Sequence, residues 1–391
     1  MKHIFPFVTL LAVVAMSTMA QTTANRRMII KTADGTTRVY DASRVSRVTF
    51  DEVTPVSVPL TLVSAAGYSV KVHATMPQGC SQYLLATIPA GEQPADLVNY
   101  IINNAAVTAN ATKDLEVGGL QPESNYTVYS LAYDAYGMVS GISSLDVSTV
   151  QATDAEKPKV GYILYADGSW SRRLDKTRTP IGIIFSTTTS QADQERGWKL
   201  GYAIALRDAA QQIAWATTIG ENQAGAIYTS ATAQGFITDK DGYSHTDTLA
   251  MNKDRHPAVA AALDYTVTAP ARSSGWYLPS SGQWYDICVN LGGADSIMNV
   301  QGTYEGYWNT PQIVSNTLSL LNEHMSIAGK DNYEPITVAS GDYRWYWCSS
   351  ESGNEQAYAV FFDQDQLVVE IAPYFKTYAF STNRVRAVIA F

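Results

Sequence analysis

Short runs in which apolar and polar residues alternate recur between residues 55 and 149, and polar or glycine-containing turns separate them. Alternation with a period of two places every second side chain on the same face of a β-strand. Several strands of this length, spaced by turns, are typical of an all-β sandwich. We therefore predict a β-sandwich over residues 55–150, with strands at 60–65, 68–76, 82–88, 126–133 and 144–149 and a short helix at 94–102.

The corner before one of these strands carries a family resemblance. The stretch Leu120-Gln-Pro-Glu-Ser-Asn-Tyr126 precedes the strand at 126–133 and resembles the late strands of a fibronectin type III domain. In that family a leucine in the turn and a tyrosine at the start of the strand lock the corner. The resemblance implies that Leu120 and Tyr126 do so here.

The first residues predict export. Lys2 is followed by an apolar run that closes on small residues ending at Ala20, which is the pattern of a secretory signal peptide. The run is too short to cross a bilayer about 30 Å thick, and no later stretch is long enough. We therefore expect residues 1–20 to be removed, leaving a secreted protein, at the cell surface or associated with the outer membrane, that has no membrane span.

Charge excludes one class of partner. The formal net charge is −9, and lysine and arginine do not cluster along the chain. Nucleic acids and anionic membranes require clustered positive charge. We therefore expect no nucleic-acid partner.

Residues 26–54 predict a small β-hairpin module. Two alternating runs are joined by Asp34-Gly35, a two-residue turn signal, and a third strand is expected at 45–50. The segment resembles the N-terminal hairpin module that precedes many surface proteins of gut anaerobic bacteria. A polar linker at 151–159 follows the sandwich, and a third domain of mixed α+β character is expected over residues 160–391.

Within this last domain we predict strands at 160–166, 181–186, 202–206, 357–362, 366–371 and 385–391 and a helix at 257–263. A second helix is opened by a capping box formed by Ser280 and Gln283. Three motifs occur in order: Tyr165-Ala-Asp-Gly-Ser-Trp-Ser171, Gly275-Trp-Tyr-Leu-Pro-Ser-Ser-Gly-Gln-Trp284, and Tyr346-Trp-Cys-Ser-Ser-Glu351 followed by Arg384-Val-Arg-Ala-Val-Ile-Ala-Phe391.

Together these motifs resemble bacterial C-type-lectin-like domains of the formylglycine-generating-enzyme subtype. That group includes exported adhesin modules and the variable proteins served by diversity-generating retroelements. The resemblance implies a C-type-lectin-like ligand-binding domain that follows the fibronectin type III-like sandwich. It also implies that the ligand face lies in the C-terminal strands and their loops.

The residues argue against catalysis. Enzymes of the subtype need a pair of reactive cysteines, and only Cys348 lies in the corresponding region. No His stands beside a Ser or Cys in a recognisable motif. Calcium-dependent lectins use loops that Glu334-Pro-Ile and Trp308-Asn-Thr match only in part, each lacking an oxygen ligand. We therefore predict neither an enzyme nor a cofactor.

Three cysteines leave two interpretations open. Cys288 and Cys348 fall in one domain and could form a disulfide, whereas three buried free thiols, with Cys80, are the alternative that the sequence favours.

Alternation in the strand at 357–362 places Tyr358, Val360 and Phe362 on one face and two alanines with Phe361 on the other. Small residues suit a crowded core, so we expect the first set to face outward. An arginine near the C-terminus is expected to pair with Glu351 or Asp363. The predicted ligand-binding residues are Arg344, Trp345, Glu351, Asn354, Gln356, Tyr358, Val360, Phe362, Asp363 and Gln364.

The predicted function is that of a cell-surface adhesin that binds a glycan or a protein. The alternative is a structural fimbrial subunit or tip component whose terminal domain serves packing against other fimbrial subunits. An enzyme acting on surface sugars or cysteines is the third class, and it would depend on Cys348.

Overall fold

The computed structural model describes residues 27–32, 35–48, 54–219, 235–301, 305–338, 343–363, 368–379 and 383–391. The predicted signal peptide at 1–20 lies outside the described residues. The chain forms two compact units, Met1–Thr54 and Pro55–Phe391. No helix among the described residues combines the length and the apolar character needed to cross a membrane.

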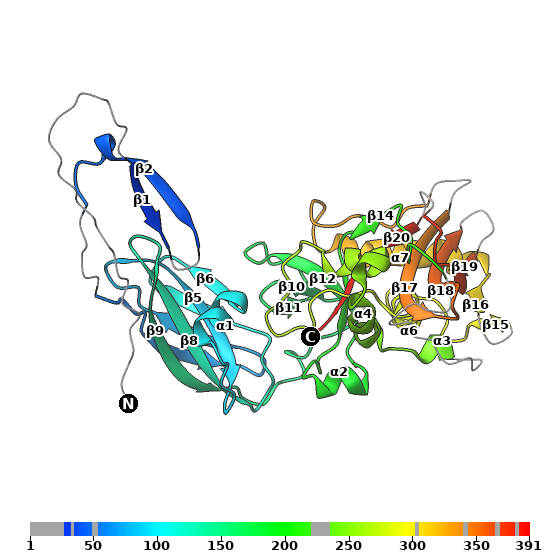
Figure 1. Ribbon diagram of the computed structural model, residues 1–391. Helices are drawn as coiled ribbons and strands as arrows, with labels where there is room; N and C mark the ends of the chain where they lie inside the picture. The colour runs from blue at the N-terminus through cyan, green and yellow to red at the C-terminus, as the bar shows by residue number, and fades with distance from the viewer. Residues whose placement is uncertain are drawn as a thin grey trace, which may run out of the picture. The chain divides into compact units, whose positions relative to one another are not determined.

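The first unit contains an antiparallel hairpin (Figure 1) of β1 (Arg27–Lys31) and β2 (Thr37–Asp41). The loop is longer than the predicted two residues, because Lys31 pairs with Thr37 and the Thr32 amide donates to the Thr36 carbonyl. The expected third strand is absent over 45–48, and residues 49–50 lie outside the described residues. Instead the 3-10 helix η1 (Ala42–Arg44), capped by the Asp41 side chain, follows β2, and residues 45–48 form no strand.

The predicted sandwich is present and has seven strands. A three-stranded sheet with the order β3-β4-β7 faces a four-stranded sheet with the order β6-β5-β8-β9, and one hydrophobic core fills the space between them. The elements are β3 (Leu60–Ala65), β4 (Val70–Ala74), β5 (Cys80–Pro89), α1 (Leu97–Asn103), β6 (Val107–Ala109), β7 (Lys113–Val117), β8 (Asn125–Asp134) and β9 (Val139–Ser148). The five predicted strands and the helix are confirmed, and β6 and β7 are additional.

The corner before β8 agrees with the sequence-based expectation. Leu120 is fully buried, and the Tyr126 hydroxyl accepts a hydrogen bond of 2.9 Å from the Gln121 amide. This bond ties the start of β8 back to the preceding turn, as a tyrosine corner does. The three-plus-four strand arrangement and this corner identify the domain as fibronectin type III-like.

The remaining residues form a domain with two sheets and several short helices. One sheet has the order β11-β10-β12-β13-β21 and the other the order β14-β20-β17-β18-β19-β16-β15. The strands are β10 (Ile163–Tyr165), β11 (Trp170–Ser171), β12 (Pro180–Ser186), β13 (Tyr202–Ala205), β14 (Ala210–Gln211), β15 (Asn299–Gln301), β16 (Glu305–Trp308), β17 (Tyr343–Glu351), β18 (Gln356–Asp363), β19 (Val368–Phe375), β20 (Asn383–Val385) and β21 (Val388–Ala390). The helices are α2 (Gln191–Glu195), α3 (Gly235–Thr238), α4 (Gly242–Ala250), η2 (Lys253–Arg255), α5 (Pro257–Leu263), α6 (Ser281–Asn290) and α7 (Pro311–Ser326).

Both helices predicted for this domain are present. The capping box is formed, because the Ser280 hydroxyl accepts from the Gln283 amide and the Gln283 side chain accepts from the Ser280 amide. The predicted strand at 385–391 is divided between β20 and β21, which belong to different sheets. Arg386 lies at the division, and its fully buried guanidinium donates to Asp208 at 2.7 Å. The terminal arginine therefore pairs with Asp208, and not with Glu351 or Asp363 as expected.

Candidate ligand-binding face

The seven-stranded sheet, with β16–β19 labelled in Figure 1, contributes to a different hydrophobic core from each of its two faces. Side chains on its inner face enter the largest hydrophobic core, which contains Tyr346, Tyr358, Val360 and Phe362 together with helix α6. The opposite face joins a second core at one end, through Trp347, Ala357 and Ala359, and Tyr374 and Tyr378 pack against that core. The other end of that face belongs to neither core and is the candidate site.

The prediction that Tyr358, Val360 and Phe362 face outward is wrong. Tyr358 stacks on Phe236 at 5.7 Å, and Phe362 packs against Trp284 of α6 at 6.5 Å between ring centroids. The two alanines do lie in a buried core, the second one, which they share with Trp347. Both faces are buried at that end of β18, so side-chain size does not distinguish them.

Other predicted residues also serve the fold. Glu351 is completely buried and forms an ion pair with the equally buried Lys376. Asp363 is only 5% exposed, and the Arg344 guanidinium donates to the neighbouring Tyr343 carbonyl at 3.2 Å. Asn354 and Gln356 are half-buried at the opposite end of the hairpin from Trp345, and Gln364 lies outside the described residues.

Trp345 is the predicted residue that lies in the candidate site. Strand register aligns Trp345 of β17 with Phe361 of β18, Phe361 with Glu370 of β19, and Glu370 with Tyr307 of β16. Directly opposed residues in neighbouring strands project from the same face of a sheet. These four residues, hereafter the cross-strand row, therefore place three aromatic rings and one carboxylate in a line about 14 Å long, at roughly 4.8 Å per strand.

More rings surround one side of the row. Trp345 lies 4.0 Å from Tyr374 and 5.7 Å from both Tyr343 and Phe361, measured between ring centroids. The Tyr378 ring is 6.4 Å from Trp345. Trp345 is 8% exposed, while the other rings are half-buried. The cluster thus has a packed centre and a partly accessible periphery, which is typical of aromatic recognition surfaces.

Glu370 supplies the charge within the row. Its carboxylate accepts a hydrogen bond of 3.1 Å from the Tyr374 hydroxyl. Partial burial raises the pKa of Glu370, the bond from Tyr374 opposes that rise, and the nearby Glu305 carboxylate adds to it. Burial, followed by the Glu370 charge, raises the pKa of the Tyr374 hydroxyl, which therefore remains a hydrogen-bond donor. The row consequently combines apolar rings with an acceptor group.

A buried cluster unites residues typical of hydrolases in a different geometry. The Ser349 hydroxyl lies 3.3 Å from His245 Nδ1, and Asp239 Oδ2 lies 3.7 Å from the same nitrogen. In a catalytic triad the hydroxyl and the carboxylate bind opposite ring nitrogens. Ser349 is fully buried, and the adjacent Ser350 hydroxyl accepts from the Ser281 amide at the start of α6. The cluster therefore joins β17 to α6 and lacks triad geometry.

The cysteines are free buried thiols, as in the alternative that the sequence favours. Burial raises the pKa of Cys288 and of Cys348 far above the ordinary thiol value, so both remain protonated. A protonated, buried thiol is a poor nucleophile. Among the residues that the structure describes, no group of three or more His, Cys, Asp or Glu side chains could hold a metal ion.

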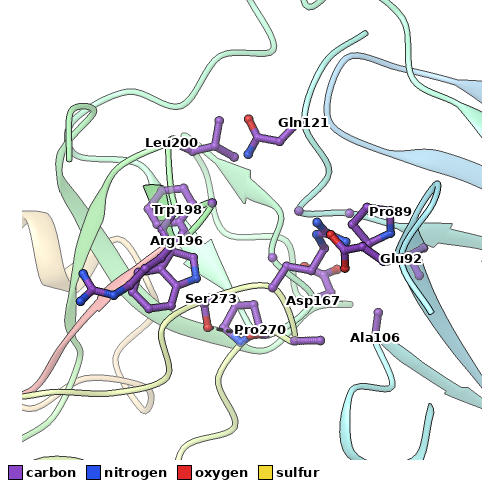
Figure 2. Close-up of a pocket in the computed structure, with 18 of the residues that line it drawn as sticks. Pro89, Glu92, Ala106, Gln121, Asp167, Arg196, Trp198, Leu200, Pro270 and Ser273 are labelled. Atoms are coloured by element: carbon purple, nitrogen blue, oxygen red, sulfur yellow. Dashed lines mark hydrogen bonds between the residues drawn. The ribbon is translucent and has the colours of Figure 1, made fainter. Parts of the chain in front are cut away.

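A polar cleft of about 240 Å³ lies within the second unit, where the sandwich meets the terminal domain (Figure 2). Trp198 and Arg196 line one side, and Glu92 and Asp167 lie on the other. Arg196 already pairs with Asp193 and lies over the Tyr243 ring. The cleft wall is thus held by contacts of its own. The cross-strand row is the stronger candidate because its half-buried rings, Tyr307 and Phe361, lie outside both core clusters and flank the half-buried Glu370.

Of the row, only Trp345 is among the residues predicted from the sequence. Alternation places Phe361 on the face expected to be buried, and no local pattern singles out Tyr307 or Glu370. Their juxtaposition depends on the register of four strands, two of which are separated by helix α7 in the sequence. The alternation within each strand is visible in the sequence, whereas the order of the strands is not.

No family model matches the chain, and no curated protein matches it. Among solved structures, the chain is similar to the FN5 domain of Drosophila Lar, at 18% identity and a TM-score of 0.19, over 25% of this chain and 100% of that one. It is similar to the fn3 domain of the human collagen alpha-1(XX) chain at 24% identity and a TM-score of 0.21, over 29% of this chain and 98% of that one. A two-domain fibronectin type III segment of chicken tenascin is similar at 12% identity and a TM-score of 0.21, over 32% of this chain and 62% of that one. The assignment of the sandwich rests on its own strand order and corner.

Proposed function

We propose that this chain is an exported, non-enzymatic binding protein that recognises a ligand at the cell surface through its terminal domain. The observation that carries the proposal is the cross-strand row, in which three rings and a carboxylate share one face of a sheet outside both hydrophobic cores. Rings stack on sugar faces or fill pockets in a partner protein, and a carboxylate orients the bound group.

The terminal domain is, in this proposal, C-type-lectin-like. Support comes from the strand β21, which returns to pair with β13 beside the first strands of the domain, and from the capped helix α6 that follows Leu278-Pro279. The fibronectin type III-like sandwich then acts as a spacer. Its described strands place no comparable row of rings on an open face.

The test measures ligand binding by the full-length chain on a glycan array and on a panel of immobilised surface proteins. The informative variant is Phe361→Ala, which removes the half-buried ring in the middle of the row. The matched control is Tyr136→Ala, since Tyr136 is 80% exposed on the sandwich. Circular dichroism verifies that both variants fold.

Wild type and Tyr136→Ala are expected to bind the same ligand, and Phe361→Ala is expected to bind it at least about tenfold more weakly, the equivalent of one lost aromatic contact. Unchanged binding by folded Phe361→Ala would refute the proposal that the row recognises the ligand. If wild type bound none of the glycans and none of the proteins, the proposed adhesin function itself would be refuted.

A structural subunit is the second candidate, and the hairpin unit favours it. Ile29 is 56% exposed and Val39 is 54% exposed, although a two-stranded hairpin needs further packing for stability. Such a subunit would assemble through this surface. Analytical ultracentrifugation would then show multimers for wild type and monomers for the Ile29→Ser, Val39→Ser double variant, and equal monomers for both would exclude this role.

A further inference from the structure

Glu370 is a partly buried carboxylate without a cationic partner. Among the described residues, no lysine, arginine or histidine forms an ion pair with it, and the Tyr374 hydroxyl is its side-chain hydrogen-bond partner. The charged groups that act on it are acidic, because Glu305 of the neighbouring strand raises its pKa and no basic group lowers it. Withdrawing a carboxylate from water without a counter-ion has an energetic cost that a bound cation would offset.

Basic side chains near this face are engaged elsewhere. Lys376, just beyond β19, is fully buried against Glu351. Arg386 pairs with Asp208 at 2.7 Å. The charge of Arg384 acts on the same aspartate, and Arg384 is not among the charged groups that act on Glu370. Arg344 occupies the alternate position on β17, between Tyr343 and Trp345, and its guanidinium donates to the Tyr343 carbonyl. The positive charge that complements Glu370 is therefore absent from the described part of this face.

The position of Glu370 between two rings indicates which kind of cationic group would fit beside it. Phe361 and Tyr307 are its direct neighbours on either side, each about 4.8 Å away in the strand-pairing direction. A compact ammonium group gains from an aromatic face within about 6 Å as well as from a carboxylate. The apolar stem of a lysine side chain, about 6 Å long, covers one strand spacing and can lie across a ring while its head reaches the carboxylate.

We propose that the cross-strand row binds a protein partner by receiving one of its lysine side chains, with the stem over Phe361 and the ammonium group on Glu370. This inference rests on the proposed function and names the partner class for the same site. It predicts a preference for polypeptides that present an accessible lysine and discrimination against acidic glycans, whose charge Glu370 and Glu305 would repel.

The test compares four labelled probes on the full-length chain by fluorescence anisotropy. Two are peptides of Gly and Ser with one central lysine, whose ε-amino group is free in one peptide and acetylated in the other. Two are sugars, a glucosamine trimer, whose free amines are partly protonated at neutral pH, and the corresponding N-acetylglucosamine trimer. The informative variant is Glu370→Gln, which keeps the shape and removes the charge. Asp154→Asn is the matched control. Asp154 is 94% exposed, and its replacement removes one negative charge at a distant surface position.

The free-lysine peptide is expected to bind wild type and Asp154→Asn about tenfold more tightly than the acetylated peptide, and Glu370→Gln should abolish that difference. Lowering the pH from about 7 to about 4 protonates Glu370, so wild type should then behave like Glu370→Gln. Glu305, Asp363 and Tyr374 face the same region. They are unchanged in Glu370→Gln, so a loss of the lysine preference in that variant at neutral pH assigns the preference to Glu370.

Equal binding of the two peptides, or an unchanged difference in Glu370→Gln, would overturn the inference. A preference for the glucosamine trimer over the lysine peptide would overturn it in favour of an amino sugar. If a neutral glycan binds wild type and is lost in Phe361→Ala while the lysine preference is absent, the proposed function stands and this inference alone fails.

Discussion

Lys376 and Glu351 form an ion pair with no exposed side-chain surface. Lys376 also donates to the carbonyls of Gly353 and Asn354, so the pair holds the turn between β17 and β18. Glu351→Gln would leave the ammonium group buried without its counter-charge. We expect the free energy of unfolding to fall by about 3–5 kcal/mol, measured by urea denaturation.

A double change, Glu351→Gln with Lys376→Met, is the control, because it removes both charges and should cost less than the single change. Burial lowers the pKa of Lys376 in the folded state, so the folded chain binds fewer protons there than the unfolded chain. In the Glu351→Gln variant stability should therefore rise as pH increases toward the ordinary lysine value. A single change that costs under about 1 kcal/mol would contradict the prediction.

At the same scale, the sequence predicted which side chains of β18 share a face and not which face is covered. Ala357 and Ala359 indicated a core, and they do lie in one, but Tyr358 and Phe362 lie in another. Glu351 has a structural role because it pairs with Lys376. The pairing of β18 with β19 brings Lys376 close to Glu351. Local patterns carry no information about such partners.

Among the elements, the corner that begins β8 offers the most defined test. In Tyr126→Phe the Gln121 amide loses the hydroxyl that accepts its hydrogen bond, while the buried ring remains. We expect a loss of about 1–2 kcal/mol in the free energy of unfolding, measured by thermal or urea denaturation. Tyr136→Phe, on the exposed Tyr136, should leave stability unchanged, and equal effects of the two changes would show that the corner bond contributes nothing.

Elements with local signals were predictable from the sequence. Pro257 and the Ser280 capping box predict where α5 and α6 begin. Alternation of apolar and polar residues predicts most strands of the sandwich. The sequence does not predict β7, because its residues Lys-Asp-Leu-Glu-Val include only two apolar side chains. The split between β20 and β21 was missed because it depends on the distant Asp208, which draws the Arg386 side chain inward.

At the scale of the whole molecule, the predicted linker at 151–159 is packed within the second unit. Glu156 accepts from the Gly67 amide, and its carbonyl accepts from the Trp170 indole at 2.8 Å. Trp170 in turn lies 5.0 Å from Tyr68 of the sandwich and 5.9 Å from Phe391, measured between ring centroids. A polar composition without periodicity indicates a linker, and it does not reveal that a tryptophan from the next domain donates a hydrogen bond to it.

These contacts predict that the sandwich and the terminal domain unfold as one cooperative unit. Trp170→Ala removes the ring shared by the linker, Tyr68 and Phe391 and deletes the hydrogen bond to Glu156. Two transitions should then replace one in calorimetry, and protease should cleave within 151–159 faster than in wild type. Lys157→Ala is the control, because Lys157 is largely exposed and its ion pair with Asp154 lies at the surface. A single transition in Trp170→Ala, with unchanged cleavage, would show that the coupling resides in other contacts, such as the ion pair of 2.9 Å between Arg178 and Glu116.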